Sequence, residues 1–278
     1  MFAAGRAIKK NSLSWFTVGV THVDDKTYVL VLHDTNQVQV FDNYFENYLG
    51  SINVPGYKPD YRGDMTSCVG QKCLYMSDVN NKCIVRYELA SKATSKWSVP
   101  AIPYGLSGTP SGNLLVTCRV PNKLVELSAD SGQLVRQITP QADIEDIFHS
   151  VQLTTDQYLV CHGAGTSGSL NRVCEIGVDG KITRSYGGKC GPGDRQLNTP
   201  CYLGVAEARG SYPEYIIVAD RENARLVWLS PKLELVQFLD ISWTHVRPNR
   251  ICVRQAARTL FVGPYENTLM FHCQVDNP

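Results

Sequence analysis

The sequence predicts an all-β fold: a six-bladed β-propeller of four-stranded antiparallel blades, with the ring closed by an N-terminal strand. One short unit recurs six times, and it consists of an apolar strand, a polar turn centred on asparagine, and a second apolar strand. Consecutive turn asparagines lie 41 to 52 residues apart; they are Asn36, Asn81, Asn122, Asn171, Asn223 and Asn267. A further apolar strand precedes each unit, and a fourth follows the first five. This period, with several strands per repeat, is typical of propeller blades.

The repeats divide the chain into a single domain over residues 1–278. The expected blades cover residues 12–58, 59–100, 101–142, 143–196, 197–244, and 245–278 together with 1–10. The last unit ends at HCQVDNP and lacks an outer strand. Because an open sheet edge exposes unpaired backbone groups, we expect residues 1–10 to pair beside it.

Composition narrows the class of protein. The chain has 27 basic and 26 acidic residues, which excludes a globally basic nucleic-acid binder but leaves room for a local basic patch. No signal-peptide pattern begins the chain, and no run approaches the ~18 apolar residues of a membrane span, so no membrane partner is expected.

Ten cysteines are present, and most of them lie inside apolar, strand-like runs. Thiols in such places behave as small buried hydrophobes, which favours reduced cysteines and a cytoplasmic location. Cys68 and Cys73 flank VGQK and could face each other across a hairpin; whether they pair stays open.

The fifth unit carries the most specific pattern, a glycine-rich lead followed by LNTP, an apolar strand and VADRENAR. This unit resembles an NHL repeat, and the matching residues are Leu197, Asn198, Pro200, Val218, Ala219, Asp220, Asn223 and Arg225. The second unit is a fair match through Asp78 and Asn81, with Lys82 as a shifted basic residue. The other four units keep little more than the asparagine and the strand pattern.

The resemblance implies a domain similar to the C-terminal part of tripartite-motif ubiquitin ligases, where NHL propellers recruit partners and several bind single-stranded RNA on one face. No RING or B-box cysteine pattern occurs in the chain, so any ligase activity would lie outside it. We therefore expect the chain to belong to a longer protein.

The turn residues have a structural interpretation. Asparagine tolerates left-handed backbone geometry and hydrogen-bonds its own chain, which suits short connections. Asp220 and Arg225 are expected to form a charge-assisted hydrogen bond across their hairpin and to hold the turn.

Catalysis is not expected from the channel positions. Propeller hydrolases and lyases hold a metal with acidic, asparagine or histidine side chains at the starts of their first strands. The corresponding positions here carry no Asp or Glu; they are Phe16, Thr17, Met65, Thr66, Tyr104, Phe148, His149, Tyr202, Asn249 and Arg250. No CxxC zinc pattern occurs either. The sequence therefore predicts no metal, no cofactor, no catalytic residue and no enzyme, with a propeller hydrolase or lyase as the less favoured alternative.

One face of the ring is the candidate binding surface, because the turns between second and third strands and the links between blades meet there. Its candidate residues are Tyr61, Arg62, Tyr104, Arg119, Lys123, Phe148, His149, Arg172, Arg195, Arg221, His245, Arg247, Asn249, Arg250 and Tyr265. Arginines among aromatic rings suit RNA bases and phosphates, and they equally suit a protein interface. Since acidic residues lie between the basic ones, we expect a monomeric module that recruits a protein or peptide, with single-stranded RNA as the alternative.

Overall fold

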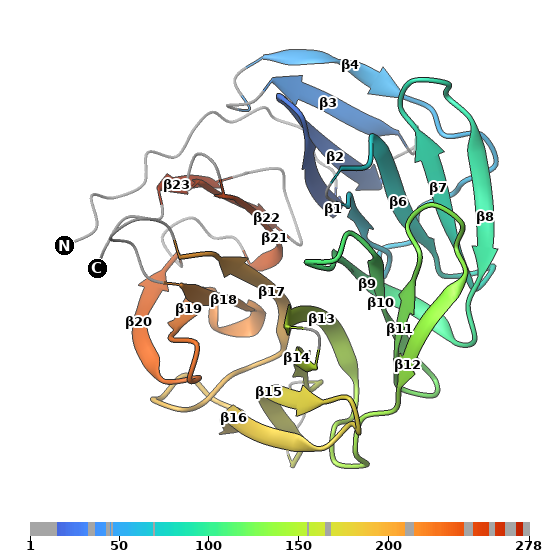
Figure 1. Cartoon of the computed structure of the whole chain (residues 1–278). Helices are drawn as coiled ribbons and strands as arrows, with labels where there is room; N and C mark the ends of the chain where they lie inside the picture. The colour runs from blue at the N-terminus through green and yellow to red at the C-terminus, as the bar shows by residue number, and fades with distance from the viewer. Residues whose placement is uncertain are drawn as a thin grey trace.

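The protein is a ring of antiparallel sheets around a central channel (Figure 1). The computed structural model describes residues 16–32, 37–42, 45, 47–68, 70–154, 156–164, 168–208, 214–241, 247–255, 259–264 and 271–274. Over these ranges there is no α-helix, and a 3-10 turn, η1 (Arg221–Asn223), connects β18 to β19. It follows that none of the described segments is a helix able to cross a membrane.

Three four-stranded sheets cover the first half of the chain, with their strands hydrogen-bonded in chain order. The first contains β1 (Phe16–Val23), β2 (Lys26–Leu32), β3 (Val38–Asp42) and β4 (Tyr48–Ile52). The second contains β5 (Met65–Thr66), β6 (Cys73–Asp78), β7 (Cys83–Glu88) and β8 (Thr94–Ser98). The third contains β9 (Ile102–Gly108), β10 (Leu114–Arg119), β11 (Lys123–Leu127) and β12 (Leu134–Ile138).

The second half of the chain adds three more sheets with the same strand order. The fourth contains β13 (Ile147–Thr154), β14 (Gln157–His162), β15 (Leu170–Gly177) and β16 (Ile182–Lys189). The fifth contains β17 (Pro200–Ala206), β18 (Tyr215–Asp220), β19 (Arg225–Leu229) and β20 (Leu235–Asp240). The last contains β21 (Pro248–Arg254), β22 (Thr259–Pro264) and β23 (Phe271–Gln274).

The number of complete blades differs from the prediction. The described residues form five four-stranded blades instead of six, because the last sheet has only three strands. The predicted closing segment, residues 1–10, lies outside the described residues, as do the turn asparagines Asn36 and Asn267. The innermost strands nevertheless complete the circle, since β1 packs against both β5 and β21.

Burial follows the position of each strand within its blade. The second strands β6, β18 and β22 are buried along their whole length, because each lies between two neighbouring blades. The outer strand β8 is almost entirely exposed at the rim. This explains why these second strands are mostly apolar whereas β8 is mostly polar.

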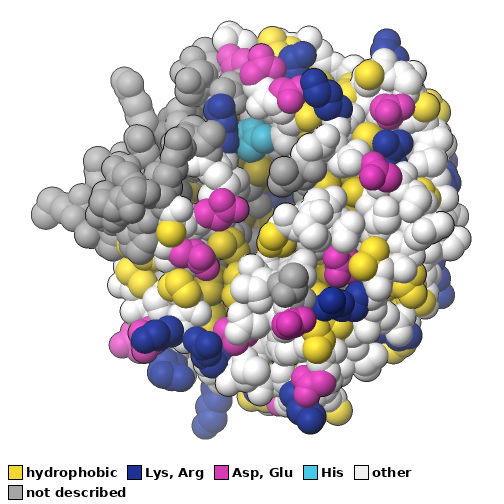
Figure 2. Space-filling model, in the orientation of Figure 1, with side chains coloured by type: hydrophobic (Ala, Val, Ile, Leu, Met, Phe, Trp, Pro, Cys, Tyr) yellow, Lys and Arg dark blue, Asp and Glu magenta, His cyan; other side chains and the backbone are white. Residues whose placement is uncertain are grey.

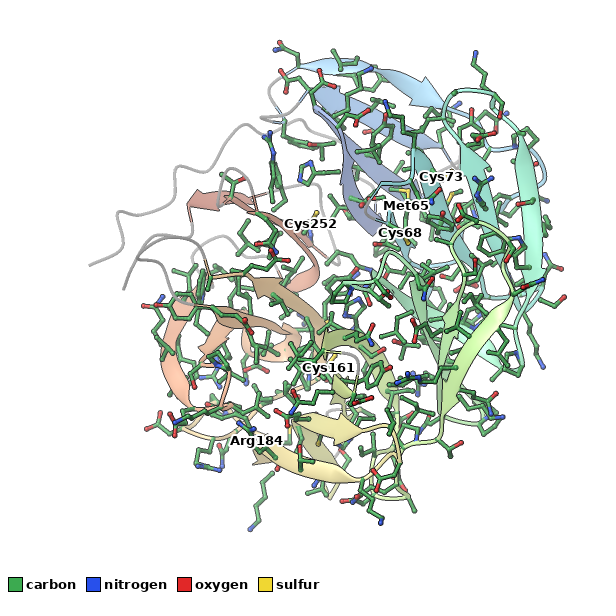
Figure 3. The ribbon with its side chains drawn as sticks, viewed as in Figure 1. Met65, Cys68, Cys73, Cys161, Arg184 and Cys252 are labelled. Carbon is green, nitrogen blue, oxygen red and sulfur yellow. The ribbon has the colours of Figure 1, made fainter. Side chains whose placement is uncertain are left out.

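No disulfide joins the cysteines whose side chains the structure describes. Cys68 and Cys73 belong to one buried cluster and form no disulfide (Figure 3). Burial raises the pKa of the Cys68, Cys118 and Cys174 thiols to about 12, so they are protonated and unreactive at neutral pH.

The fifth blade shows how the turn motif holds its neighbourhood. Arg225 Nε donates to Asp220 Oδ2 at 2.7 Å, and Asn223 Nδ2 donates to the same oxygen at 2.7 Å. The guanidinium also donates to the carbonyl oxygens of Pro192 and Gln196, at 2.6 and 2.8 Å. These bonds fasten the glycine-rich lead to the hairpin. In the second blade, by contrast, the cation near Asp78 is Lys96 (3.7 Å) rather than the Lys82 of the sequence match.

Close approach between neighbouring inner strands requires glycine at alternate blades. Gly19, Gly105 and Gly204 lie on β1, β9 and β17, and each faces the inner strand of the next blade. A Cβ on Gly105 would lie 2.6 Å from the carbonyl oxygen of Phe148, and one on Gly204 would lie 2.8 Å from Ile251 Cγ2. The channel is therefore narrow because these positions lack side chains.

We expect Gly105→Ala to lower the free energy of unfolding by about 1–3 kcal/mol, because the backbone of β13 cannot move away without disturbing the ring. Gly177→Ala is the matched control, since its Cβ would meet only the Asp179 carboxylate at 3.1 Å, and it should change stability by less than about 0.5 kcal/mol. Urea unfolding of both variants checks this. Equal stabilities would show that the inner strands are not closely packed.

Candidate functional site

A pocket of about 230 Å³ opens where the channel meets one face of the ring. Its lining residues come from five of the six sheets or the links before them; they are Tyr61, Arg62, Tyr104, Gly105, Arg119, Phe148, Cys201, Tyr202, Arg221, Asn249 and Arg250. The local reason is the repeat itself, because each blade brings the start of its first strand to this end of the channel. The lining thus combines four aromatic rings with four arginines.

Ring stacking holds the guanidinium of Arg119 in the pocket wall. Its central carbon lies 4.7 Å from the ring centroid of Tyr104 and 5.2 Å from that of Phe148. Arg221 approaches the same Phe148 ring at 5.9 Å. Burial among the rings, with a weaker effect of the nearby Arg62 charge, lowers the pKa of Arg119, which remains charged at neutral pH.

Six arginines of this face form ion pairs. The sequence carries little net positive charge, and on this face the basic side chains lie next to acidic ones. The pairs are Arg62–Asp60, Arg119–Asp146, Arg172–Asp143, Arg221–Glu222, Arg247–Glu222 and Arg250–Asp64. Six arginines therefore share five carboxylates.

A buried carboxylate lies behind the Tyr202 and Arg250 side chains of the pocket wall. Asp64 is fully buried and accepts hydrogen bonds from the backbone N–H groups of Met65 and Leu106, both at 2.8 Å. The Tyr202 hydroxyl donates to it at 3.0 Å, and Arg250 Nε lies 3.3 Å away. Burial raises the pKa of Asp64 to about 6, and the Arg250 charge opposes that rise.

Arg250 connects this carboxylate to the backbone of three blades. Its Nε donates to the Val18 carbonyl at 2.6 Å, its Nη2 to the Gly63 carbonyl at 2.5 Å, and its Nη1 to the Asn249 carbonyl at 2.9 Å. With these donors engaged, Arg250 acts as a structural cation whose charge is satisfied inside the protein.

The buried side chains of Asp64, Tyr202 and His149 together form a plug in the channel. Of these, His149 is neutral. Its Nδ1 accepts from the Leu203 N–H at 3.4 Å and its Nε2 donates to the Leu106 carbonyl at 3.1 Å, which fixes the tautomer. Burial lowers its pKa to about 3. The 4.0 Å approach to Asp64 is therefore no ion pair. The imidazole stacks on the Tyr202 ring at 3.7 Å between centroids.

A second and larger cavity of about 780 Å³ lies on the other side of this plug. It is lined mainly by the inner strands, and His149 and Tyr202 form its floor. Its described wall combines aliphatic side chains such as Val20, Val151 and Ile251 with hydroxyl groups such as those of Thr21 and Ser107. On the face drawn in Figure 2, acidic and basic side chains are interspersed over most of the surface.

The structure brings eight of the fifteen predicted face residues to the pocket: Tyr61, Arg62, Tyr104, Arg119, Phe148, Arg221, Asn249 and Arg250. Lys123, Arg172, Arg195 and Arg247 lie outside its lining, and His149 lies beneath it. Two predicted residues, His245 and Tyr265, lie outside the described residues.

Sequence reasoning missed the carboxylate at the centre of the channel. Asp64 directly precedes β5 in the segment GDMT, one position before the strand starts that were expected to carry no acid. The isolated Asp before an inner strand was the available signal. The described residues contain no group of three or more His, Cys, Asp or Glu side chains that could hold a metal ion.

Comparison with known proteins supports the fold. Virginiamycin B lyase from Staphylococcus aureus is similar with a TM-score of 0.64 and 14% identity, over 96% of this chain and 89% of the lyase. A catalytically inactive histidine-to-alanine variant of that lyase, bound to quinupristin, gives a TM-score of 0.63 and 14% identity over 96% and 88% of the two chains. An auxiliary nutrient binding protein from Bacteroides thetaiotaomicron gives a TM-score of 0.64 and 13% identity, over 92% of this chain and 68% of that protein. No family model and no curated protein matches the sequence.

These findings correct two expectations. The prediction that the chain is not an enzyme is overturned at the level of fold, because the similar structures include lyases. The NHL assignment is narrowed to a β-propeller, since the similar structures are lyases and binding proteins and no NHL family model matches. At 13–14% identity the likeness establishes the fold alone.

The neutral state of His149 generates a pH-dependent prediction. The pKa of His149 is lowered from 6.5 in the unfolded chain to about 3 in the folded protein. Its contribution to the free energy of unfolding is therefore complete at pH values above 6.5, and it is lost as the pH falls toward 3. His149→Gln keeps both hydrogen bonds, because the amide can donate to the Leu106 carbonyl and accept from the Leu203 N–H. As the pH falls from about 6 to about 4, the free energy of unfolding of the wild type should decrease by about 1.4 kcal/mol per pH unit more than that of the variant.

Urea unfolding across this pH range measures the difference. Burial also lowers the pKa of His162, to about 4. Because His162 is present in both proteins, the difference between their stability curves reports on His149. Parallel stability curves would contradict a neutral, buried His149.

Proposed function

We propose that this chain binds a protein or peptide partner through the channel-mouth pocket, with one partner side chain entering between the rings and the arginines. The convergence of eight sequence-predicted residues on one pocket is the observation that carries the proposal. Its volume of about 230 Å³ is below the roughly 300 Å³ at which pockets for drug-sized ligands begin, and it suits a single side chain. Tyrosine and arginine are the residues most enriched at interface hot spots.

Charge favours a protein over RNA. Sites that track a nucleic-acid backbone need a clear positive excess, whereas the arginines here are matched by Asp60, Asp143, Asp146 and Glu222. An interface of paired charges around exposed rings is instead typical of protein recognition, where fixed ion pairs set orientation and specificity.

The finer features of the sequence prediction belong to the same proposal. We treat β21–β23 as a sixth blade that residues 1–10 complete, and the chain as an NHL-like module within a larger, tripartite-motif-like protein. The mostly buried cysteines, with no disulfide among those that the structure describes, support a reducing, cytoplasmic location.

The proposal predicts that Tyr61→Ala weakens partner binding at least about tenfold, because the exposed Tyr61 ring lines the pocket mouth. Tyr48→Ala is the matched control: Tyr48 lies on the outer strand β4 and is 55% exposed, against 54% for Tyr61. The probes are peptides enriched from a displayed random library on the wild-type protein, with affinities measured by fluorescence anisotropy.

A gel-shift titration with a random single-stranded RNA pool, at low and physiological salt, runs in parallel. No enriched peptide together with RNA retained at micromolar protein would overturn the proposal in favour of RNA. Equal losses in both tyrosine variants would place the binding surface elsewhere.

A further inference from the structure

Two guanidinium groups converge on one phenol in the pocket wall. Arg62 and Arg119 line the pocket beside Tyr104, although they come from the link before β5 and from the end of β10. The Arg119 guanidinium lies 4.7 Å from the Tyr104 ring centroid, and the nearby Arg62 charge helps to lower the pKa of Arg119. Two like charges in one pocket wall repel each other, and an anion placed between them relieves that repulsion.

The acidic partners of these two arginines differ in kind. Asp60 binds Arg62 through both oxygens, at 2.7 and 2.9 Å, and its side chain is 13% exposed. Asp146 binds Arg119 from the solvent side, and its side chain is 42% exposed. The first pair is built into the wall, whereas the second can be exchanged at small cost, because a half-exposed carboxylate regains water when it leaves.

Asp146 has a φ of +50°, in the left-handed region, which aspartate and asparagine adopt more readily than most other residues. Its carboxylate is the acidic group paired with Arg119.

We propose that the pocket recognises a carboxylate of the partner peptide, either an acidic side chain or the chain terminus, which takes the place of Asp146 on Arg119. This inference rests on the proposed function and names the chemistry of the partner. Arg62 and the Tyr104 hydroxyl complete the anion's surroundings, and the Phe148 ring contacts the carbon chain that carries it.

A carboxylate fits better than a phosphate for two reasons. The exchange with Asp146 replaces one single negative charge by another, so the paired charges of the site stay balanced. Arg119 is also enclosed by the Tyr104 and Phe148 rings, and a dianion costs more than a monoanion to bring into such a partly desolvated place.

The test uses synthetic peptides that carry Glu, Gln or Lys at one central position flanked by randomised residues, each with a free or an amidated C-terminus. The wild-type protein should prefer Glu over Gln, or the free over the amidated terminus, by about tenfold. Arg119→Gln and Arg62→Gln should each remove most of that preference.

Asp146→Asn gives the sharper test, because this variant should bind acidic peptides about three- to tenfold more tightly than the wild type. Asparagine tolerates the left-handed backbone and keeps the shape, so only the competing charge is lost. A merely structural Asp146 would not produce a gain. Arg184→Gln is the control: Arg184 lies on the outer strand β16, away from the channel (Figure 3), and pairs with Glu175 at 3.7 Å.

The outcomes separate this inference from the proposed function. Peptides that bind through Tyr61 without any preference for a carboxylate would overturn the inference and leave the pocket as a protein-binding site. Unchanged or weaker binding of acidic peptides by Asp146→Asn, at an unchanged melting temperature, would also overturn it. Loss of all peptide binding, with RNA retained, would overturn the function itself.

Discussion

The buried pairing of Asp64 with Arg250 is the interaction on which the rest of the structure depends. The carboxylate takes hydrogen bonds from the second, third and fifth blades, and the guanidinium donates to backbone carbonyls beside the first, second and last sheets. His149 lies on β13 in the fourth blade, and its hydrogen bonds to Leu106 and Leu203 connect that blade to the third and fifth. Because neither charge could remain buried alone, the inner strands must all be in place before the pair is satisfied. The closed ring is thereby specified as one arrangement.

This central cluster also sets what the channel can do. It separates the small arginine-lined pocket from the larger cavity of the opposite side, and Tyr202 contributes to the lining of both. The pocket wall is held in advance by ring stacking on Arg119 and by the bidentate Asp60 pair. Side chains fixed before binding lose little conformational entropy on binding, which favours selective recognition over a small contact area.

The fold is shared by proteins of different kinds, among them a lyase and a nutrient binding protein, so the function has to be argued from the site. In this chain the channel carboxylate is engaged by four protein donors, and the arginines around the mouth are matched by acids. Both features point to recognition by paired charges and rings. Among the acids paired with arginines of the pocket lining, Asp146 is the most exposed, and the proposed carboxylate of the partner would replace it.

The sequence by itself determined the repeat, the strand order and the end of the ring where arginines and rings gather. These follow from local periodicity, because the position of a residue within its repeat fixes whether it lies at the start of an inner strand or at a turn. The tertiary structure decided the rest. Asp64 and Arg250 are far apart in the chain, and nothing in the segment GDMT reveals that its carboxylate is buried beside a guanidinium from the last sheet. The pairing of Arg119 with Asp146, and the choice of eight face residues for the pocket over the others, likewise depend on distances between blades. Contacts of this kind arise only when the ring closes, so no local pattern in the sequence encodes them.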